Sequence, residues 1–242
     1  MSVRYGTVNP SAFYLKDKAA RYLYQGNILV WPDSIPYSYT TVTIGACTWA
    51  AQNAREKVFK NGDPIAYVPD PIAWQAANAT NTPAWCYVNN DPSTEAVHGI
   101  LYNGWAASDA RGIGPTGFRV PTKLEWTDLI NCVATTYSVP TSVAARYLKS
   151  DATVPNGGWQ PGTPVIPNNF DATGSSWRGS GGSWIEPVPG IPFGWISYYG
   201  TSSFTATPPN QWDAIELEYN QDIALQTGIN PGAGVLIRYI TI

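Results

Sequence analysis

The residues of this chain that could perform catalysis are few. His98 is the single histidine among 242 residues, so a serine or cysteine nucleophile that needs an imidazole base would depend on it. A general base also needs a positioned partner, which the sequence does not indicate. The acidic pairs Asp213 with Glu216, and Glu216 with Glu218, could form the carboxylate pair of a glycosidase. Along a strand, however, Glu216 and Glu218 point to the same solvent face. We therefore expect no catalytic residue.

Residues for metal or disulfide chemistry are equally sparse. Cys47, Cys86 and Cys132 are far apart and odd in number, without the paired spacing of a zinc site. Free cysteine commonly behaves as a small buried hydrophobe. We expect that role for all three, and one disulfide among them stays open. Calcium needs about six to eight oxygen ligands, and the fragments around Glu186 and Asp213 supply too few. We expect no metal and no cofactor.

Residues 177–204 concentrate aromatic side chains among glycine, serine and threonine. Flat rings give a large contact area at little entropic loss, and small polar residues adapt around them, as in binding surfaces. Tryptophan also stacks on the apolar faces of sugar rings. For Trp195 and Trp212 we expect core positions, and for the other rings core and surface positions both stay open. The predicted ligand-binding residues are Trp177, Arg178, Trp184, Glu186, Tyr198, Tyr199 and Phe204.

The elements that carry these residues must be short. Charged residues make up 13% of the chain and aromatic residues another 13%, alongside 22 glycines and 21 prolines. Each glycine or proline interrupts regular structure, while tryptophan and tyrosine provide the burial that holds irregular backbone in place. We predict an α+β fold with short twisted antiparallel strands, one or two short helices and long ordered loops.

The start of one helix is clearly marked. Pro121 ends an extended run because it cannot donate a ladder hydrogen bond. Thr122 can then cap a helix, and Glu125 three residues later completes a capping box. We expect this helix to end by Tyr137, and a second, short helix over residues 72–81. Three residues should share the buried face of the capped helix: Leu124, Leu129 and Val133.

Charge and hydropathy exclude two classes of partner. The formal net charge is −3, and lysine and arginine are scattered without a cluster that could follow phosphates, so we expect no nucleic-acid binding. The sequence has no apolar run of about eighteen residues, so we expect no membrane insertion. The N-terminal residues lack the apolar stretch of a secretory signal. We therefore expect no export by the signal-peptide route.

The block from residue 85 to residue 129 resembles a known bacterial module. It combines an aromatic, asparagine-rich strand and turn, an apolar segment at residues 99–106, a glycine loop and the motif GFRVPTKLEW at residues 117–126. Trp49, Asn53 and the turn at residues 61–65 stand at matching places upstream. This order resembles the FISUMP domain, the major paralogous domain of bacterial surface proteins. The resemblance covers about residues 40 to 242.

Several expectations follow from this resemblance. The FISUMP domain belongs with C-type lectin-like and formylglycine-generating-enzyme-like folds, so the resemblance implies a C-type lectin-like fold whose last strand pairs near the first. It also implies display and binding rather than catalysis. The related formylglycine-generating enzymes depend on cysteines in the C-terminal part of the fold, and here no cysteine follows Cys132.

The first 36 residues have the pattern of a separate segment. Runs rich in strand formers occupy residues 13–15, 21–24 and 28–31, with turn residues between them, which predicts two or three short strands. The segment YQGNILVWPD is similar to short elements of bacteriophage virion proteins; an ordinary hairpin that packs on the main domain is the alternative. We assign residues 1–36 to an attachment or oligomerisation segment and residues 37–242 to the FISUMP, C-type lectin-like domain.

Three functions from different classes are consistent with these features. The leading hypothesis is a bacteriophage head or tail fibre protein on the virion surface, which binds a host surface glycan or protein. Its N-terminal segment would contact other virion proteins, and a homotrimer is expected because fibres commonly close threefold. The second hypothesis is a bacterial surface or secreted adhesin. The third is a degenerate or carbohydrate-active enzyme that uses Asp213 or Glu216.

Overall fold

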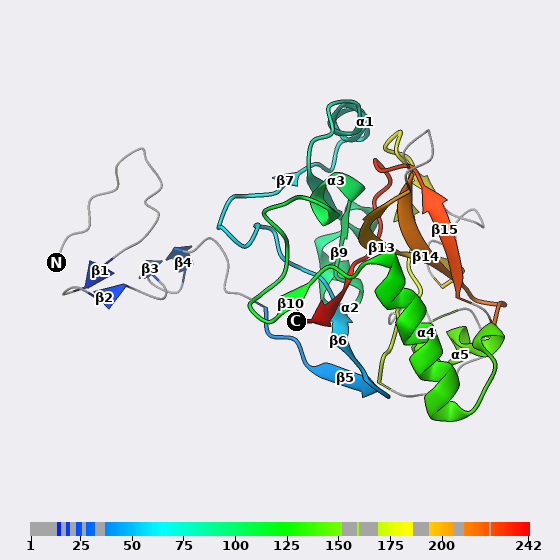
Figure 1. The fold of residues 1–242 in the computed structure, drawn as a ribbon. Coiled ribbons are helices and arrows are strands. Elements are labelled where there is room, and N and C mark those ends of the chain that lie inside the picture. Colours follow the sequence, from blue (N-terminus) through cyan, green and yellow to red (C-terminus); the bar gives the residue numbers. More distant parts are fainter. Residues whose placement is uncertain are drawn as a thin grey trace. The chain divides into compact units, whose positions relative to one another are not determined.

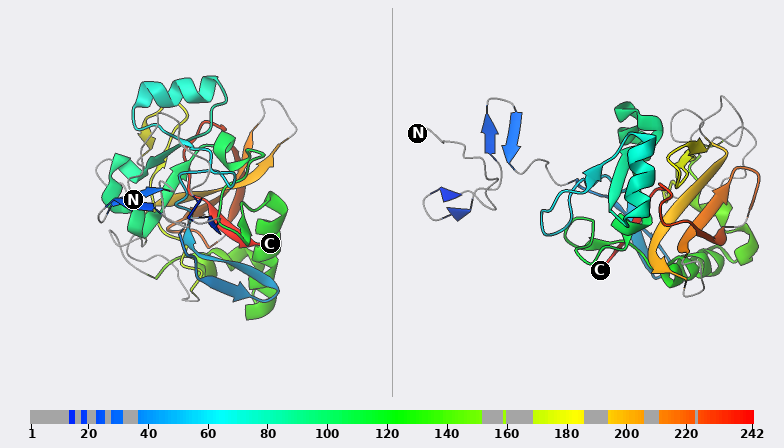
Figure 2. Two further views of the ribbon diagram at one scale, coloured as in Figure 1. Left: turned by 90° about the vertical axis from the view of Figure 1, so that its left-hand side faces the viewer. Right: turned by 90° about the horizontal axis from the view of Figure 1, so that it is seen from above.

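The computed structural model describes residues 37–151, 159, 169–185, 194–205, 211–222 and 224–242, together with four short strands nearer the N-terminus. The chain divides into two compact units, Met1–Pro36 and Tyr37–Ile242. The strands of the first unit form two antiparallel hairpins (Figure 2). These hairpins are β1 (Tyr14–Leu15) with β2 (Lys18–Ala19), and β3 (Leu23–Gln25) with β4 (Ile28–Trp31).

The first strands of the second unit share a sheet with the last strand of the chain (Figure 1). The order across this antiparallel sheet is β10 (Phe118–Arg119), β16 (Arg238–Thr241), β6 (Cys47–Asn53) and β5 (Thr41–Ile44). Along β5, the two threonines are exposed, while Val42 and Ile44 are buried. This alternation is that of a strand with one solvated face. The last strand therefore pairs with β6, near the first strand of this unit, as the resemblance implied.

A second antiparallel sheet holds the longest strands. Its order is β13 (Ile196–Phe204), β14 (Trp212–Glu218) and β15 (Leu225–Ile229). A strand through Glu216 and Glu218, at the position of β14, was expected from the sequence, whereas β15 was not. Isolated bridges tie Leu236 to Tyr199 and Val235 to Tyr102, so the segment before β16 connects this sheet with the rest of the domain.

Two smaller sheets complete the strand content of the described residues. Strand β8 (Ala84–Tyr87) lies between β7 (Ala66–Tyr67), which is parallel to it, and β9 (Ile100–Tyr102), which is antiparallel. Strands β11 (Trp177–Arg178) and β12 (Trp184–Ile185) form a hairpin around a glycine-rich turn. Gly182 has a φ of +88°, and a Cβ there would lie 2.2 Å from the carbonyl oxygen of Pro71. This turn therefore packs directly on Pro71, the first residue of the first helix.

Two helices are longer than one turn among the described residues. Helix α1 (Pro71–Ala79) is capped by the Asp70 side chain, and α4 (Lys123–Tyr137) begins with the predicted capping box of Thr122 and Glu125. Both helices lie where the sequence predicted them. The remaining helical turns are α2 (Glu95–His98), α3 (Gly104–Ala107), α5 (Ala145–Leu148), and the 3₁₀ turns η1 (Val88–Asn90), η2 (Pro92–Thr94) and η3 (Thr141–Val143).

One of the three residues predicted for the buried face of α4 lies outside it. Leu124 is 67% exposed, and Trp126 heads the buried stripe instead. The buried residues are Trp126, Leu129, Ile130 and Val133. Their spacing of three, four and seven residues follows the helical repeat, and Leu124 falls outside that stripe. The assignment of Leu124 to the core was therefore wrong, because the larger tryptophan two residues later occupies the inner face.

Aromatic rings fill the core between α4 and the two larger sheets. The Trp126 ring centroid lies 4.7 Å from that of Trp49 and 5.7 Å from that of Tyr199, and Phe170 contacts both tryptophans. All four residues are almost completely buried. Strand β6, α4, β13 and the loop at Phe170 thus meet at one cluster, which buries rings contributed by segments far apart in the sequence.

A buried arginine joins the last strand to this core. Arg238 is completely buried; its Nε donates to Asn53 Oδ1 at 2.9 Å, and its guanidinium donates to the carbonyl oxygens of Phe170 at 2.7 Å and Asp171 at 3.1 Å. Carbonyl and amide oxygens thereby satisfy a charge that would otherwise be costly to bury. Arg238 therefore fixes β16 to β6 and to the chain around residue 170.

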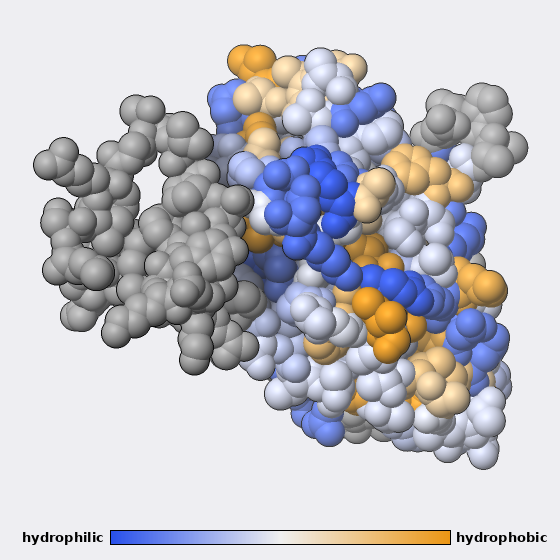
Figure 3. All heavy atoms as spheres, turned by 60° about the vertical axis from the view of Figure 1, so that its left-hand side comes forward, coloured by the Kyte–Doolittle hydropathy of each residue, from blue (hydrophilic) through white to orange (hydrophobic). Residues whose placement is uncertain are grey.

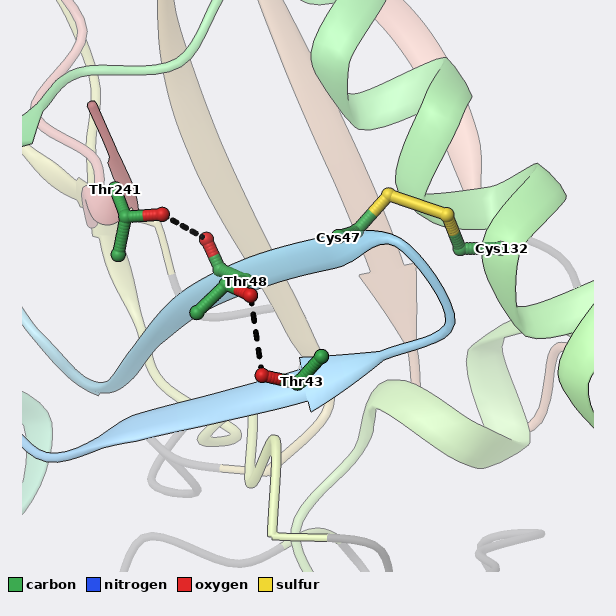
Figure 4. The surroundings of a disulfide bond; sticks show 5 residues. All are labelled: Thr43, Cys47, Thr48, Cys132 and Thr241. Atoms are coloured by element: carbon green, nitrogen blue, oxygen red, sulfur yellow. Dashed lines mark hydrogen bonds between the residues drawn. A yellow bond between two sulfur atoms is a disulfide. The ribbon is translucent and has the colours of Figure 1, made fainter.

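The cysteines are not all free. Cys47, at the start of β6, forms a disulfide with Cys132 of α4, 85 residues away in the sequence (Figure 4). The adjacent turn packs closely on the helix, since a Cβ at Gly45 would lie 2.9 Å from Thr136 Oγ1. Cys86 is a free, buried thiol, and burial raises its pKa to about 12. The expectation of three small buried hydrophobes therefore holds for Cys86 alone, and the possibility of one disulfide is realised.

The outside of the domain is mixed in polarity. On the face drawn in Figure 3, apolar residues form small separate patches among polar ones. Among the described helices, none is long and apolar enough to cross a bilayer. The domain is thus a mixed α+β structure of several small sheets with two longer helices.

Candidate ligand-binding site

The predicted aromatic residues separate into surface and interior positions. Trp177 of β11 and Tyr198 of β13 are partly exposed, and their rings meet edge to face, with centroids 4.9 Å apart. This arrangement is favourable for the quadrupoles of the two rings. Two of the seven predicted residues thus form one pair at the surface.

Strand geometry decides which tyrosine of the Tyr198-Tyr199 pair faces outward. Strand β13 pairs with β14 so that Tyr198 lies opposite Glu216 and Tyr199 opposite Ile215. Because side chains alternate along a strand, Tyr198 and Glu216 share the outer face, and Tyr199 and Ile215 share the buried one. Glu218, two residues beyond Glu216, returns to the outer face and is also partly exposed.

The carboxyl groups of this outer face interact with each other and with Tyr198. Partial burial raises the pKa of Glu216, and its hydrogen bond with the neighbouring Glu218 raises it further, whereas the Tyr198 hydroxyl lowers it. Burial and the Glu216 carboxylate together raise the pKa of Tyr198. Two rings and two acids therefore form one connected surface, the outer-face cluster of Trp177, Tyr198, Glu216 and Glu218.

The position of Trp177 is fixed by hydrogen bonds of the residues before it. The Ser176 hydroxyl donates to Asn89 Oδ1 at 2.8 Å, and the Ser175 amide donates to Ser197 Oγ at 2.7 Å. Asn89 lies in η1 with a φ of +52°, a left-handed conformation that asparagine tolerates better than most residues. These two hydrogen bonds hold the backbone before Trp177 in place, so that its ring meets Tyr198.

Arg178 is a structural residue rather than a surface one. It is completely buried, and its guanidinium donates to the carbonyl oxygens of Gly182, Val68 and Pro69 at 2.7–2.9 Å. The rings of Trp74 and Trp184 lie 4.6 and 5.4 Å from the charge. The predicted ligand contact of Arg178 is corrected, because its guanidinium is buried and already hydrogen-bonded. These bonds join the β11–β12 hairpin to the chain between β7 and α1. Trp184, partly exposed, covers this arginine.

The remaining predicted residues do not converge with the outer-face cluster. Tyr199 is completely buried, and its hydroxyl donates to the carbonyl oxygen of Thr173 at 3.1 Å. Its predicted surface role is therefore corrected. Phe204 stacks on Trp105 at 5.7 Å, and it is six residues from Tyr198 along β13, or about 20 Å. Glu186 lies outside the described residues.

The two tryptophans expected in the core differ. Trp212 is completely buried, and its Nε1 donates to the carbonyl oxygen of Thr201. Trp195 is only partly buried and meets the Tyr219 ring at 4.4 Å. The core position of Trp212 is thus confirmed, whereas Trp195 lies at the margin of the interior because it precedes the first residue of β13.

The residues that could have formed a catalytic group are not assembled into one. His98 is 1% exposed, and burial lowers its pKa to about 4. Asp213 and Glu216 lie on opposite faces of β14, and Asp213 is buried in an ion pair with Lys123 at 3.0 Å. Within the described parts of the chain, histidine, cysteine and acidic side chains form no group of three that could hold a metal ion.

An open pocket of about 490 Å³ lies beside this ion pair. It contains none of the residues predicted to bind a ligand. Its lining comes from the start of α4, from β13 and from β14: Thr122, Lys123, Leu124, Thr127, Ser203 and Asp213. No local pattern in the sequence indicated this pocket, since its walls come from segments about 80 residues apart that only the folded chain brings together.

The comparison with known families identifies this chain. The profile of the Fibrobacter succinogenes major domain family matches residues 42–240, and the chain belongs to this family. The predicted FISUMP resemblance is thereby confirmed, and the family indicates a surface-associated protein of bacterial type. No curated protein matches the chain, and no solved structure does.

Proposed function

We propose that residues 37–242 form a non-enzymatic recognition domain with a C-type lectin-like fold, which binds a glycan or protein of a host cell surface. The observation that carries the proposal is the outer-face cluster, in which Trp177 and Tyr198 form a partly exposed ring pair beside Glu216 and Glu218. Rings provide contact area, and carboxylates accept hydrogen bonds from sugar hydroxyls or peptide amides. The cluster is held by a sheet and by hydrogen-bonded loops, so little conformational entropy is lost on binding.

The protein that carries this domain is proposed to be a bacteriophage head or tail fibre on the virion surface; a bacterial surface or secreted adhesin is the alternative. Membership of a surface-associated family supports both. The Cys47–Cys132 disulfide also supports both, because such bonds persist mainly outside the reducing cytoplasm. The alternatives differ in timing: a virion protein would oxidise after lysis, and an exported protein before it.

Alkylation of thiols in intact producing cells, followed by a non-reducing gel, separates these alternatives. An exported adhesin should already carry the disulfide when the cells are alkylated. A virion protein should be reduced in cells and oxidised in released particles. The Cys47→Ser variant supplies the mobility of the reduced form. Cys86→Ser is the matched control, because Cys86 is buried and takes no part in the disulfide.

For the virion protein we also propose a homotrimer attached through residues 1–36. The two hairpins of the first unit support this proposal, since isolated two-stranded hairpins are marginal in water and gain stability by burying apolar faces together. Light scattering should give about three times the chain mass of 26.3 kDa. A monomer at micromolar concentration would contradict this assembly.

The recognition proposal is tested by Trp177→Ala and Tyr198→Ala. We expect each to weaken binding to host cells and to arrayed host glycans by about tenfold or more, because central aromatic anchors commonly contribute over 1 kcal/mol. The matched control is Tyr137→Ala, since Tyr137 is also partly exposed and stacks on Tyr147 at 4.3 Å, at the far end of α4. Unchanged binding in both site variants, or turnover of a glycan that Glu216→Gln abolishes, would contradict the proposal.

A further inference from the structure

A second group of rings surrounds the exposed Tyr67, on a different sheet from Tyr198. Tyr67 of β7 leans on Trp85 of β8, with ring centroids 4.6 Å apart and an interplanar angle of 31°. Tyr87 meets both rings, at 5.6 Å from Tyr67 and 5.1 Å from Trp85. This group, the β7 shelf, belongs to the sheet of β7, β8 and β9, whereas Tyr198 and Glu216 belong to the sheet of β13, β14 and β15.

Charged side chains hold the β7 shelf at its Tyr87 ring. The Lys57 ammonium lies 5.1 Å from the ring centroids of both Trp85 and Tyr87, within the range of a cation–π contact. It donates to the Tyr87 hydroxyl at 3.1 Å and to Glu95 at 3.0 Å. The Tyr37 hydroxyl donates to the other oxygen of Glu95. The rings and the ion pair therefore hold each other in one geometry.

The outer side of the shelf is open. Tyr67 is 47% exposed, while Trp85 beneath it is buried. One face of the Tyr67 ring rests on Trp85, so the exposed area belongs largely to its other face and edge. No hydrogen bond or ion pair of the described residues involves the Tyr67 hydroxyl, so its position comes from ring packing. A rigid, exposed ring offers contact area at little entropic cost.

We propose that the β7 shelf is a second binding site, which takes an uncharged sugar ring. The apolar C–H face of a pyranose stacks on Tyr67, and its hydroxyls bond to the Glu95 carboxylate and the Lys57 ammonium, whose side chains are 18% and 27% exposed. The ligand is uncharged because the two groups neutralise each other, so an ion of either sign would disrupt an existing pair. Two sugar sites on one domain would bind a branched or repeating glycan with higher avidity than either alone.

The experiment compares Tyr67→Ala with Tyr137→Ala in the full chain. Both remove a partly exposed tyrosine that stacks on another ring, and only Tyr67 belongs to the shelf. The probe is an array of immobilised uncharged oligosaccharides, with sulfated and uronic-acid oligosaccharides as the charged counterpart. We expect Tyr67→Ala to weaken binding of an uncharged probe by about tenfold, Tyr67→Phe to keep it, and Tyr137→Ala to leave it unchanged. Equal melting temperatures confirm that the variants are folded.

Three results would overturn the proposal: no uncharged probe binds the wild type, Tyr67→Ala behaves like Tyr137→Ala, or charged probes bind better. The shelf extends the proposed recognition function, and its failure is distinguishable from that of the outer-face cluster. If Trp177→Ala loses binding and Tyr67→Ala does not, the outer-face cluster is kept as a binding site and the shelf is rejected. The converse result would keep the shelf and reject the first site.

Discussion

Tyr198 and Tyr199 are neighbours in sequence, yet they lie in two different parts of the molecule. Tyr199 packs on Trp126 in the core at 5.7 Å, and Tyr198 meets Trp177 on the outer face at 4.9 Å. Residue type does not distinguish these two environments, since both consist of tyrosine against tryptophan. The alternation of strand β13 distinguishes them. An aromatic-rich sequence therefore predicts that rings will cluster, and the register of a strand decides which cluster can meet a ligand.

Charged residues divide in the same way. In the interior, the guanidinium groups of Arg178 and Arg238 donate hydrogen bonds to backbone and amide oxygens. On the outer face, Glu216 interacts with Glu218 and Tyr198, and both glutamates remain partly exposed. A buried charge that is fully bonded stabilises one arrangement of the chain, whereas a partly exposed one keeps acceptor capacity for a partner.

The largest expected effect is the difference in stability between variants of the two tyrosines. Tyr199→Ala should lower the free energy of unfolding by about 3–5 kcal/mol, because it removes a completely buried ring. Tyr198→Ala should lower it by about 1 kcal/mol or less. Denaturant titrations of both variants measure the difference. Equal losses would show that the outer ring is as structural as the inner one.

The interior should also respond to acid through His98. Burial lowers the pKa of folded His98 to about 4, against about 6.5 when unfolded. Its contribution to stability is therefore fully present above pH 6.5 and is lost as the pH falls towards 4, by about 3 kcal/mol in all. Unfolding titrations between pH 7 and pH 4 should reveal this loss, and His98→Gln should reduce the slope. An identical slope in the variant would assign acid sensitivity to other groups.

Glu216 on the outer face should respond in the opposite direction and more weakly. Its pKa is raised in the folded state, mainly by partial burial, so its contribution is present at low pH and is lost as the pH rises through the folded pKa. Glu216→Gln should thus gain stability relative to the wild type between pH 4 and pH 8, by less than about 1 kcal/mol because the group is partly solvated. A relative loss over that range would contradict the raised pKa.

The smallest effect is expected at Leu124, which the sequence placed in the core and the structure places outside. Because its side chain is 67% exposed, Leu124→Ser should change the free energy of unfolding by about 0.5 kcal/mol or less. Leu129→Ser is the matched comparison on the same helix, since Leu129 is completely buried, and it should be severely destabilising. Comparable losses in the free energy of unfolding of the two variants would show that Leu124 belongs to the buried face of α4, as the sequence predicted.

Local signals in the sequence predicted much of the fold. The capping box at Thr122 and Glu125 set the start of α4, and the predicted end at Tyr137 agrees with the observed one. Predictions failed where a distant partner decides the outcome: the Cys47–Cys132 bond joins residues 85 positions apart, and strand β15 depends on the adjacent β14. Of the candidate site, Trp177 and Tyr198 were predicted as ligand-binding residues, whereas Glu216 was considered as a possible catalytic acid and as an acid on a solvent face.

By itself, the sequence determined the local conformations and the family, because caps, turn residues and the central motif depend on near neighbours. Only the tertiary structure decided which side of each aromatic cluster faces water. It also decided that Arg178 is buried and hydrogen-bonded to backbone carbonyl oxygens. The physical reason is that exposure depends on what packs against a side chain, and those partners come from remote segments. The contact of Lys57 with Trp85 and Tyr87 illustrates this, because a loop and strand β8 meet there although no local pattern connects them.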